Sequence, residues 1–363
     1  MINYGKPDAG KLACPVWMGA VCNSYQKINF DIETQIIYPY QKTIETIVRE
    51  TIKDIGYINK EDNFYYLDLL IVNLINQQSE EINKAVSVNG GAGDQGAMFG
   101  YATNETLCYM PLQFVLSRNL ALQLNKIREN KILPFLKPDG KTQLTMTCDE
   151  KGNLCYIDSI VISCHHSDII KNNKTFSDDI IKYVITPVIP IKFINVKTKF
   201  YINPAGSFIQ GGPCFDTGLT GRKIIQDSYG SEVRHGGGCF SGKDASKVDR
   251  SGAYMLRYLA KNIVASGICD KCELQIAYVI GVNFPVGLFI NTFNTNRVND
   301  NLILDTIYNN FDLSPQGIIN QLNLTKPIFH MTAKYGHFGV DNDKFSWEKT
   351  DKIKLFSRLL NKF

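Results

Sequence analysis

The sequence has no hydrophobic run long enough to cross a membrane, because no window reaches the roughly 18 consecutive apolar residues that a spanning helix needs. Its first residues also lack the apolar core of a secretory signal peptide, since Met1–Met18 contains Lys6, Asp8, Lys11 and two prolines. Both absences argue against membrane and exported proteins. We therefore expect a cytoplasmic protein with no membrane partner.

A strong excess of charge of one sign is also missing. Lys and Arg number 39 and Asp and Glu 35, which gives a net charge of +4. Proteins that bind nucleic acid or anionic lipid through their overall charge are far more basic than this. We expect no nucleic-acid partner, and any anion-binding surface must come from local clustering of cations.

The ten cysteines do not form a metal-binding pattern. Cys269 and Cys272 make one CxxC, but no second pair follows at zinc-site spacing and the context is not thioredoxin-like. We interpret this pair as a coincidence. In a cytosolic protein the thiols are expected to be reduced.

Low-complexity linkers and internal repeats are absent, and 44% hydrophobic residues in a chain of 363 are enough for two or three packed units. Apolar spacing predicts helices, and alternation predicts strands, interspersed along the chain. This mixture favours an α+β protein with more than one sheet. The predicted helices cover Thr43–Ile55, Leu112–Ile127, Ser177–Pro187, Ser246–Ser266, Asp300–Phe311 and Lys352–Leu360, and the strands a hairpin at Thr142–Ser163 and segments at Glu273–Val282 and Leu288–Phe293.

Glycine concentrates in two places. The first is the segment 89–96, where Gly90, Gly91 and Gly93 precede Asp94. Such a backbone can take positive φ and approach a ligand closely, and Asp94 could meet a cation or a ribose there. A tight surface turn with a solvated acid explains the same residues equally well.

The second glycine-rich stretch, 211–250, also carries cations. Flexible glycine backbone offers N–H donors and the cations neutralise charge, so together they predict a polyphosphate site. The alternative is a solvated basic face, but such faces are usually helices rich in Lys and Glu. The cations on or beside these loops are Arg222, Lys223, Lys243, Lys247 and Arg250.

A P-loop fits this stretch poorly. Gly237 to Lys243 has the Gly-x4-Gly-Lys pattern, but Asp244 stands where that motif needs Ser or Thr for magnesium. The acids Asp94, Asp216 and Asp249 accompany the cations, and magnesium at nucleotide sites is usually held by one or two carboxylates plus phosphate oxygens. His165, His166 and His235 are interpreted as structural.

Five blocks of the sequence resemble the methionine adenosyltransferase (S-adenosylmethionine synthetase) family, in the family's order. They are GAGDQGAMFGYATNET (91–106), LPFLKPDGKTQLT (133–145), GGPCFDTGLTGRKIIQDSYG (211–230), GGGCFSGKDASKVDRSGAY (236–254) and YGHFG (335–339). The resemblance implies three pseudo-symmetric units of mixed sheet covered by helices, here 1–90, 91–210 and 211–363. It also implies that the sheets pair in a homodimer or a dimer of dimers with shared sites.

The family transfers the adenosyl group of ATP to the sulfur of L-methionine and hydrolyses the triphosphate to phosphate and pyrophosphate. By resemblance, the catalytic cations are Lys141, Arg222, Lys243 and Lys247, and Asp249 is a ligand of magnesium, expected as two ions per site. Lys84 and Asp94 lie in the loop that closes the active site, and Asp216, Lys247 and Glu33 bind methionine. The ATP-binding residues are Asp139, Lys141, Ser207, Phe208, Asp216, Arg222, Lys223, Lys243 and, through its backbone, Cys239.

The start of the chain departs from the family. Gly5-Lys6-Pro7-Asp8 has lysine for the histidine of the family's Gly-His-Pro-Asp-Lys motif, and the helix that should follow is missing before Ala13-Cys14. Pro15 replaces a glutamate that helps bind potassium, which weakens the case for potassium here. Lys84 replaces a loop glutamine, and Ser207 an arginine. A second hypothesis is therefore a weak or silent relative that binds ligand or assembles with an active family subunit.

Overall fold

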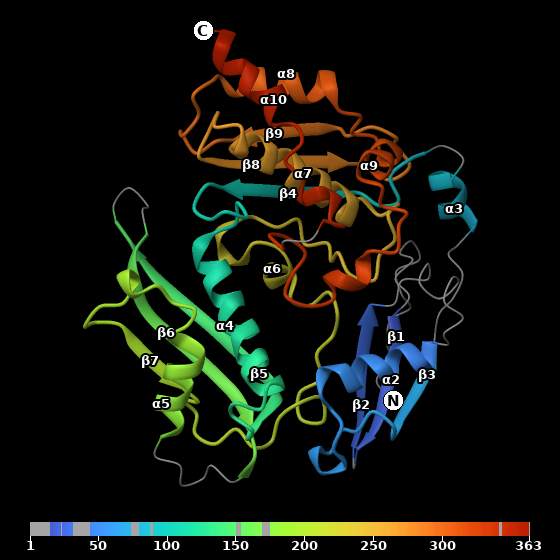
Figure 1. Ribbon diagram of the computed structural model, residues 1–363. Coiled ribbons are helices and arrows are strands. Elements are labelled where there is room, and N and C mark those ends of the chain that lie inside the picture. The colour runs from blue at the N-terminus through green and yellow to red at the C-terminus, as the bar shows by residue number, and fades with distance from the viewer. Residues whose placement is uncertain are drawn as a thin grey trace.

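The computed structural model describes residues 15–22, 24–31, 44–73, 80–87, 90–149, 154–168, 175–340 and 343–362. Within these ranges the strands form three three-stranded sheets, each with helices packed on it (Figure 1). The α+β class predicted from the sequence is confirmed. No helix of the described ranges combines the length and apolarity that crossing a bilayer requires.

The first sheet has the order β2-β1-β3 and is antiparallel throughout. It contains β1 (Pro15–Cys22), β2 (Ser24–Asp31) and β3 (Leu69–Asn73). Helix α2 (Ile44–Ile55) supplies Val48 and Ile52 to a small core that Phe64 and Leu69 complete. Its Arg49 donates hydrogen bonds to the carbonyl oxygens of Tyr66, Leu67 and Leu69, which hold the segment that leads into β3.

The second sheet has the order β5-β6-β7, with β5 (Leu136–Cys148) antiparallel to β6 (Leu154–His166) and β7 (Lys199–Ile202) parallel to it. Helices α4 (Leu112–Glu129) and α5 (Phe176–Ile180), continued by a π-helical turn at Ile181–Ile185, share its core. Between Leu136 and Gly140, β5 advances four residues while β6 advances two. The resulting bulge carries Pro138 and Asp139 out of the regular ladder.

The third sheet has the order β4-β8-β9 and joins segments far apart in the chain: β4 (Gly96–Thr103), β8 (Lys271–Tyr278) and β9 (Gly287–Asn291). Helix α7 (Val248–Ala265) crosses it closely, because an added Cβ at Gly100 would lie 2.2 Å from the backbone carbon of Leu256. Buried positions occupy nearly the whole length of α7, so this helix is the centre of the largest core.

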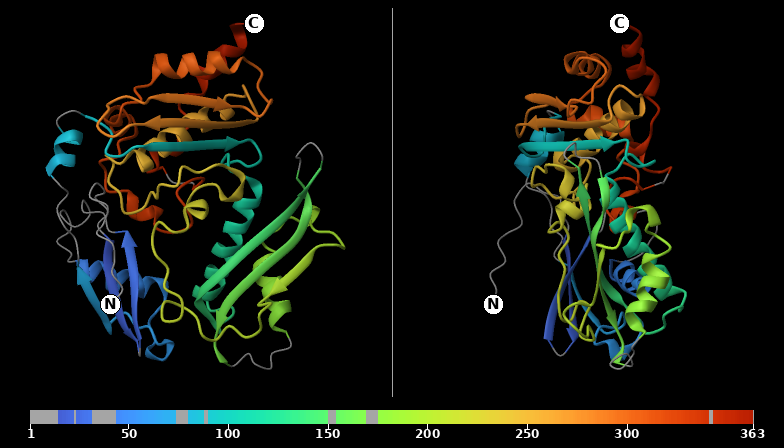
Figure 2. Two further views of the ribbon diagram at one scale, coloured as in Figure 1. Left: turned by 180° about the vertical axis from the view of Figure 1, so that it is seen from behind. Right: turned by 90° about the vertical axis from the view of Figure 1, so that its left-hand side faces the viewer.

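The sheets and helices separate into two layers. In the right-hand view of Figure 2 the strands lie toward one side of the molecule and α2, α4 and the C-terminal helices toward the other. The remaining elements are α3 (Glu80–Ser87), α6 (Ile224–Asp227), α8 (Asp300–Asn310), α9 (Pro315–Leu322), α10 (Ile353–Ser357) and short helical turns at Lys60–Asp62, Ile191–Phe193, Gly230–Glu232, Phe329–Thr332, Ser346–Glu348 and Arg358–Lys362.

Most of the helices and strands predicted from periodicity are confirmed. The segments 43–55, 112–127, 246–266 and 300–311 are helical within two residues at each end, and the hairpin strands are β5 and β6. The turn of this hairpin, at residues 150–153, lies outside the described residues. One prediction is corrected: the thiols were expected to be reduced, but Cys214 is disulfide-bonded. The strand β4 was not predicted from the sequence. Seven described cysteines, among them Cys269 and Cys272, are free thiols as expected.

Candidate functional site

The glycine-rich loop 236–243 lies directly against β4 and the beginning of α7. An added Cβ at Gly236 would lie 1.7 Å from the carbonyl oxygen of Ala97 in β4, and one at Gly238 would lie 2.2 Å from Cγ of Asp249 in α7. Side chains at these two positions would therefore push the loop off the strand or displace the carboxylate. Glycine is needed here for close approach.

Lys243 and Asp249 form a direct ion pair at the end of this loop. The side chain of Lys243 is fully buried and that of Asp249 is 11% exposed, so the pair is nearly dry. It lies in the first turn of α7, where backbone N–H groups give the helix a partial positive charge. The structure thus brings together the lysine predicted to hold phosphate and the aspartate predicted to bind magnesium.

Lys247 occupies the position immediately before α7 and is also buried. Its Nζ lies 3.2 Å from Oδ2 of Asp244 and donates a 3.1 Å hydrogen bond to Oγ of Ser246. Asp244 also accepts a hydrogen bond from the backbone N–H of Ser246. Asp244 therefore stabilises the turn that leads into α7. The Ser or Thr at this position of a P-loop binds magnesium instead.

The first glycine-rich segment, residues 90–95, packs against Ser246 and Lys247. An added Cβ at Gly93 would lie 3.4 Å from the carbonyl oxygen of Ser246 and 3.6 Å from Cδ of Lys247. Asp94, the next residue, is half-buried and accepts a hydrogen bond from the N–H of Gln95. The predicted loop position of Lys84 is corrected: the residue lies in helix α3, where it is exposed. Segment 90–95 is thus a neighbour of the loop that ends in Lys243.

Arg222 and Lys223 lie on a loop that packs on the same glycine segment. An added Cβ at Gly221, whose φ is +80°, would lie 2.7 Å from Cβ of Cys239. Both cationic side chains are exposed beside this contact. The 219–223 loop therefore contacts the 236–243 loop at Cys239.

Arg250 is a correction to the predicted phosphate-binding cations. It is 1% exposed, lies 3.7 Å from the ring centre of Phe329, and donates hydrogen bonds to Tyr254, Thr332 and the carbonyl oxygen of Lys243. The guanidinium of Arg250 is therefore engaged in contacts within the core. Arg250 holds the backbone of Lys243 in place, and sequence spacing alone did not distinguish this role from ligand binding.

His337, in the YGHFG block, contacts the glycine-rich loop 236–243 through Ser241. Its Nδ1 lies 2.6 Å from Oη of Tyr254 and its Nε2 3.1 Å from Oγ of Ser241. Tyr254 also accepts a hydrogen bond from Nε of Arg250, so His337, Tyr254, Ser241 and Arg250 form one buried polar chain beneath the loop. Burial, together with the charge of Arg250, lowers the pKa of His337 well below its ordinary range.

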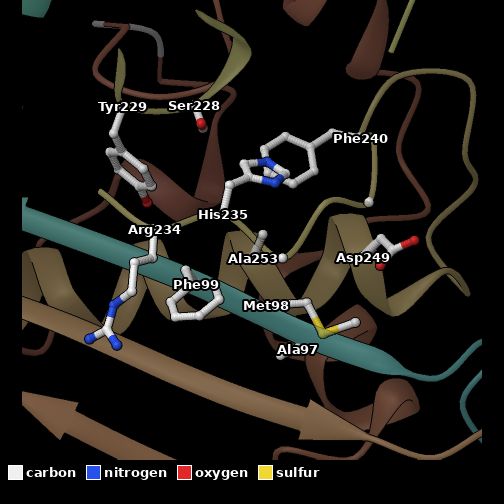
Figure 3. A pocket seen from close by; sticks show the side chains of 12 residues that line it. Ala97, Met98, Phe99, Ser228, Tyr229, Arg234, His235, Phe240, Asp249 and Ala253 are labelled. Carbon is white, nitrogen blue, oxygen red and sulfur yellow. The ribbon is translucent and has the colours of Figure 1, made fainter. Parts of the chain in front are cut away.

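His235 lines a small cavity of about 10 Å³ between β4, α7 and the glycine loop, with Met98, Phe99, Tyr229 and Asp249 among the other lining residues (Figure 3). Burial lowers the pKa of His235, and Lys243 adds to the shift while Asp249 opposes it. The cavity has room for about one water-sized group.

A second group of predicted residues gathers around Asp139. Its Oδ2 accepts a 2.9 Å hydrogen bond from the N–H of Gly212, which ties the β5 bulge to the start of the second glycine stretch. Gly212 has a φ of +79°, and an added Cβ there would lie 2.8 Å from Oη of Tyr57. Burial and the charge of Asp139 raise the pKa of this tyrosine.

The remaining ATP-side predictions lie near this second group. The ring centres of Phe208 and His165 lie 5.4 Å apart, tilted by 32°, and the N–H of Phe208 donates to Nε2 of His166. These contacts are compatible with the structural interpretation of both histidines. Ser207, Lys141 and Asp216 are exposed. Glu33 lies outside the described residues.

Magnesium fits this site only if a ligand shares it. No group of three or more His, Cys, Asp or Glu side chains arranged for a metal ion occurs in the part of the chain that the structure describes. Asp249 offers one nearly buried carboxylate beside a lysine. That donor set is suited to an ion held by one carboxylate and by phosphate oxygens, and it is unsuited to a cage made of protein ligands alone.

Two parts of the chain match models of known protein families. Residues 89–208 match the family model described as S-adenosylmethionine synthetase, central domain. Residues 210–349 match the model described as S-adenosylmethionine synthetase, C-terminal domain. The two matches include all the described candidate residues except Lys84.

Proposed function

The chain belongs to the S-adenosylmethionine synthetase family, and we propose that it makes S-adenosylmethionine from ATP and L-methionine. The observation that carries the proposal is the buried contact between Lys243 and Asp249 in the first turn of α7, flanked by two glycine loops with exposed Arg222 and Lys223. This arrangement concentrates donors and positive charge where a polyphosphate would bind.

The proposed reaction is an in-line attack of the methionine sulfur on C5′ of ATP. The thioether loses no proton, so no general base is required. The protein must orient the two reactants and stabilise the charge that develops on the departing triphosphate. Lys243, Lys247, Arg222, Lys223 and Lys141 supply that charge in the proposal, and the triphosphate is then hydrolysed to phosphate and pyrophosphate.

The residues Asp139, Ser207, Phe208, Asp216 and Cys239 complete the proposed ATP contacts, and Asp216, Lys247 and Glu33 the methionine contacts. Asp249 would hold magnesium, which when bound neutralises phosphate charge and leaves Lys243 free to contact the same phosphates. Lys84 and Asp94 are proposed to close over the bound substrates. The proposed need for potassium is weaker because Pro15 replaces the family's glutamate.

The open faces of the sheets support a proposed dimer. In β3, Leu70 and Val72 are 49% and 42% exposed while Leu69 is buried, so alternate apolar side chains point away from α2. In β9, Phe289 is 53% exposed beside the buried Ile290. A second copy packed on this layer would cover these side chains. Light scattering should show at least a dimer, and an active monomer would contradict the shared-site proposal.

The product assay tests the proposed function. The purified chain is incubated with ATP, L-methionine, magnesium and potassium, and S-adenosylmethionine, phosphate and pyrophosphate are quantified by chromatography. All three products should accumulate. In a parallel incubation tripolyphosphate is added directly, and its hydrolysis without formation of S-adenosylmethionine would place the defect on the methionine side. No turnover of either kind would contradict the proposed activity.

A second candidate is a non-catalytic relative that binds ligand or assembles with an active subunit. The departures at Pro15, Lys84 and Ser207 favour it, because each replaces a residue that contacts an ion or a ligand in the family. Co-expression with an active family member tests it. The candidate predicts co-purification and altered activity of the partner, and the absence of both would overturn it.

A further inference from the structure

His235 has a buried donor that the proposed function does not use. Its Nδ1 accepts a 2.9 Å hydrogen bond from the N–H of Gly237, so Nδ1 is the unprotonated ring nitrogen. The neutral ring therefore carries its proton on Nε2. Nε2 is buried and has no hydrogen-bond partner among the described residues. Buried N–H groups without an acceptor are rare in folded proteins, so this one calls for an acceptor.

The ring of His235 packs beside Phe240 and lines a small cavity. The imidazole lies 5.4 Å from the ring of Phe240, tilted by 32°, and Figure 3 shows the two rings together above β4. Asp249 and Gly238 line the same cavity, which has about 10 Å³. This space has room for about one water-sized group, such as a single substrate oxygen.

We propose that the Nε2–H of His235 donates a hydrogen bond to an anionic oxygen of the bound substrate at the glycine loop. The inference rests on the proposed function and adds one residue to its site. The first turn of α7 favours an anion at this point, and Lys243 offsets the charge of Asp249, which lines the same cavity. Two substrates offer such an oxygen, the triphosphate chain of ATP and the carboxylate of methionine, and the experiment separates them.

Three variants of His235 separate the donor from a packing role. His235→Gln keeps an N–H near the position of Nε2, and His235→Asn keeps an acceptor near the position of Nδ1 for Gly237. His235→Phe keeps the ring against Phe240 and removes both nitrogens. If His235 only supports the loop through Gly237, the Asn variant should behave best; if it donates to the substrate, the Gln variant should.

The measurements are the Kd of inorganic tripolyphosphate with magnesium, by calorimetry on the full chain, and the KM for methionine in the product assay. If the acceptor is the triphosphate, Asn and Phe should weaken tripolyphosphate about tenfold or more and Gln less than about threefold. If the acceptor is the carboxylate, the same order should appear in the KM for methionine with the tripolyphosphate Kd unchanged.

Equal behaviour of the three variants and the wild type in both measurements would overturn the inference, as would rescue by Asn in place of Gln. Thermal denaturation identifies a variant that does not fold, and the comparison of Gln with Asn stands without His235→Phe. A wild-type chain that neither binds tripolyphosphate nor makes product would instead overturn the proposed function itself.

Discussion

At the scale of single residues, the site depends on glycines that allow charged side chains to meet. Gly238 leaves just enough space for the carboxylate of Asp249, which in turn contacts Lys243. Arg250 donates a hydrogen bond to the carbonyl oxygen of Lys243. The positions of the two charges therefore depend on a residue with no side chain and on a buried arginine that holds the backbone of Lys243.

Gly238→Ala tests this dependence. The new Cβ would lie 2.2 Å from Cγ of Asp249, so the carboxylate must move away from Lys243. We expect the rate of S-adenosylmethionine formation to fall by about 10²-fold, the loss typical of a small misplacement of catalytic groups. The matched control is Gly287→Ala in β9, where no atom lies within 4 Å of an added Cβ. A Gly238→Ala enzyme as fast as the control would contradict the account.

At the scale of elements, α7 connects the site to the core. Its buried face carries Arg257 and Lys261, both bonded to the buried Glu348 near the end of the chain. Burial of Glu348 alone would raise its pKa, but Arg257 and Lys261 hold it below its ordinary range. Arg257 also donates to the carbonyl oxygens of Tyr101, Cys108 and Tyr109, so α7, β4 and the following loop share one polar network.

Glu348→Ala should therefore destabilise the fold by about 3–5 kcal/mol, because it leaves the buried charge of Arg257 uncompensated. The free energy of unfolding is measured by urea denaturation. Glu129→Ala is the control: its side chain is 53% exposed, so a change of no more than about 0.5 kcal/mol is expected. Equal effects of the two substitutions would show that the network contributes no more than a surface ion pair.

The sequence predicts the amphipathic helices well because their apolar spacing is periodic, as in Leu112–Glu129 and Val248–Ala265. It does not predict β4, because glycine and alanine at 96, 97, 100 and 102 have low strand propensity. This strand is stabilised by its pairing with β8. Likewise, the glycine-rich pattern predicted Lys243 and Asp249 as site residues. It could not predict that Arg250 packs inward against Phe329 and Thr332. Those contacts join segments about eighty residues apart and depend on the tertiary fold.

At the scale of the whole molecule, the units are joined by polar contacts. Lys137 in β5 pairs with Asp62 at 2.6 Å, and Arg128 in α4 donates to the carbonyl oxygen of Ile55 at the end of α2. The C-terminal segment closes the largest core, where Trp347 stacks on Tyr254 and donates to the carbonyl oxygen of His337. His337 is thus a buried histidine on which both the core and the glycine loop depend.

The stability of the molecule should fall in mild acid. Burial lowers the pKa of His337 in the folded state, while the unfolded chain titrates near about 6.5. Below that pH the unfolded state binds a proton that the folded state refuses, so the free energy of unfolding decreases as pH falls. The contribution of one such group is at most about 1.4 kcal/mol per pH unit.

Urea denaturation at pH 7.5 and 5.5 measures this loss, and His337→Gln should reduce it. His330→Gln is the comparison, since His330 is more exposed than His337 and partial burial lowers its pKa less strongly. A larger reduction for His330→Gln than for His337→Gln would show that His337 is not the group responsible.

The central claim is that the Lys243 site at the start of α7 carries out adenosyl transfer. The most direct test compares the rate of S-adenosylmethionine formation by the wild type, Lys243→Ala and Lys326→Ala, an exposed lysine in the same unit. We predict a loss of about 10²–10³-fold for Lys243→Ala, as for the removal of a group that stabilises the transition state, and an unchanged rate for Lys326→Ala. Product formation that survives Lys243→Ala, or a wild type that makes no product, would contradict the account.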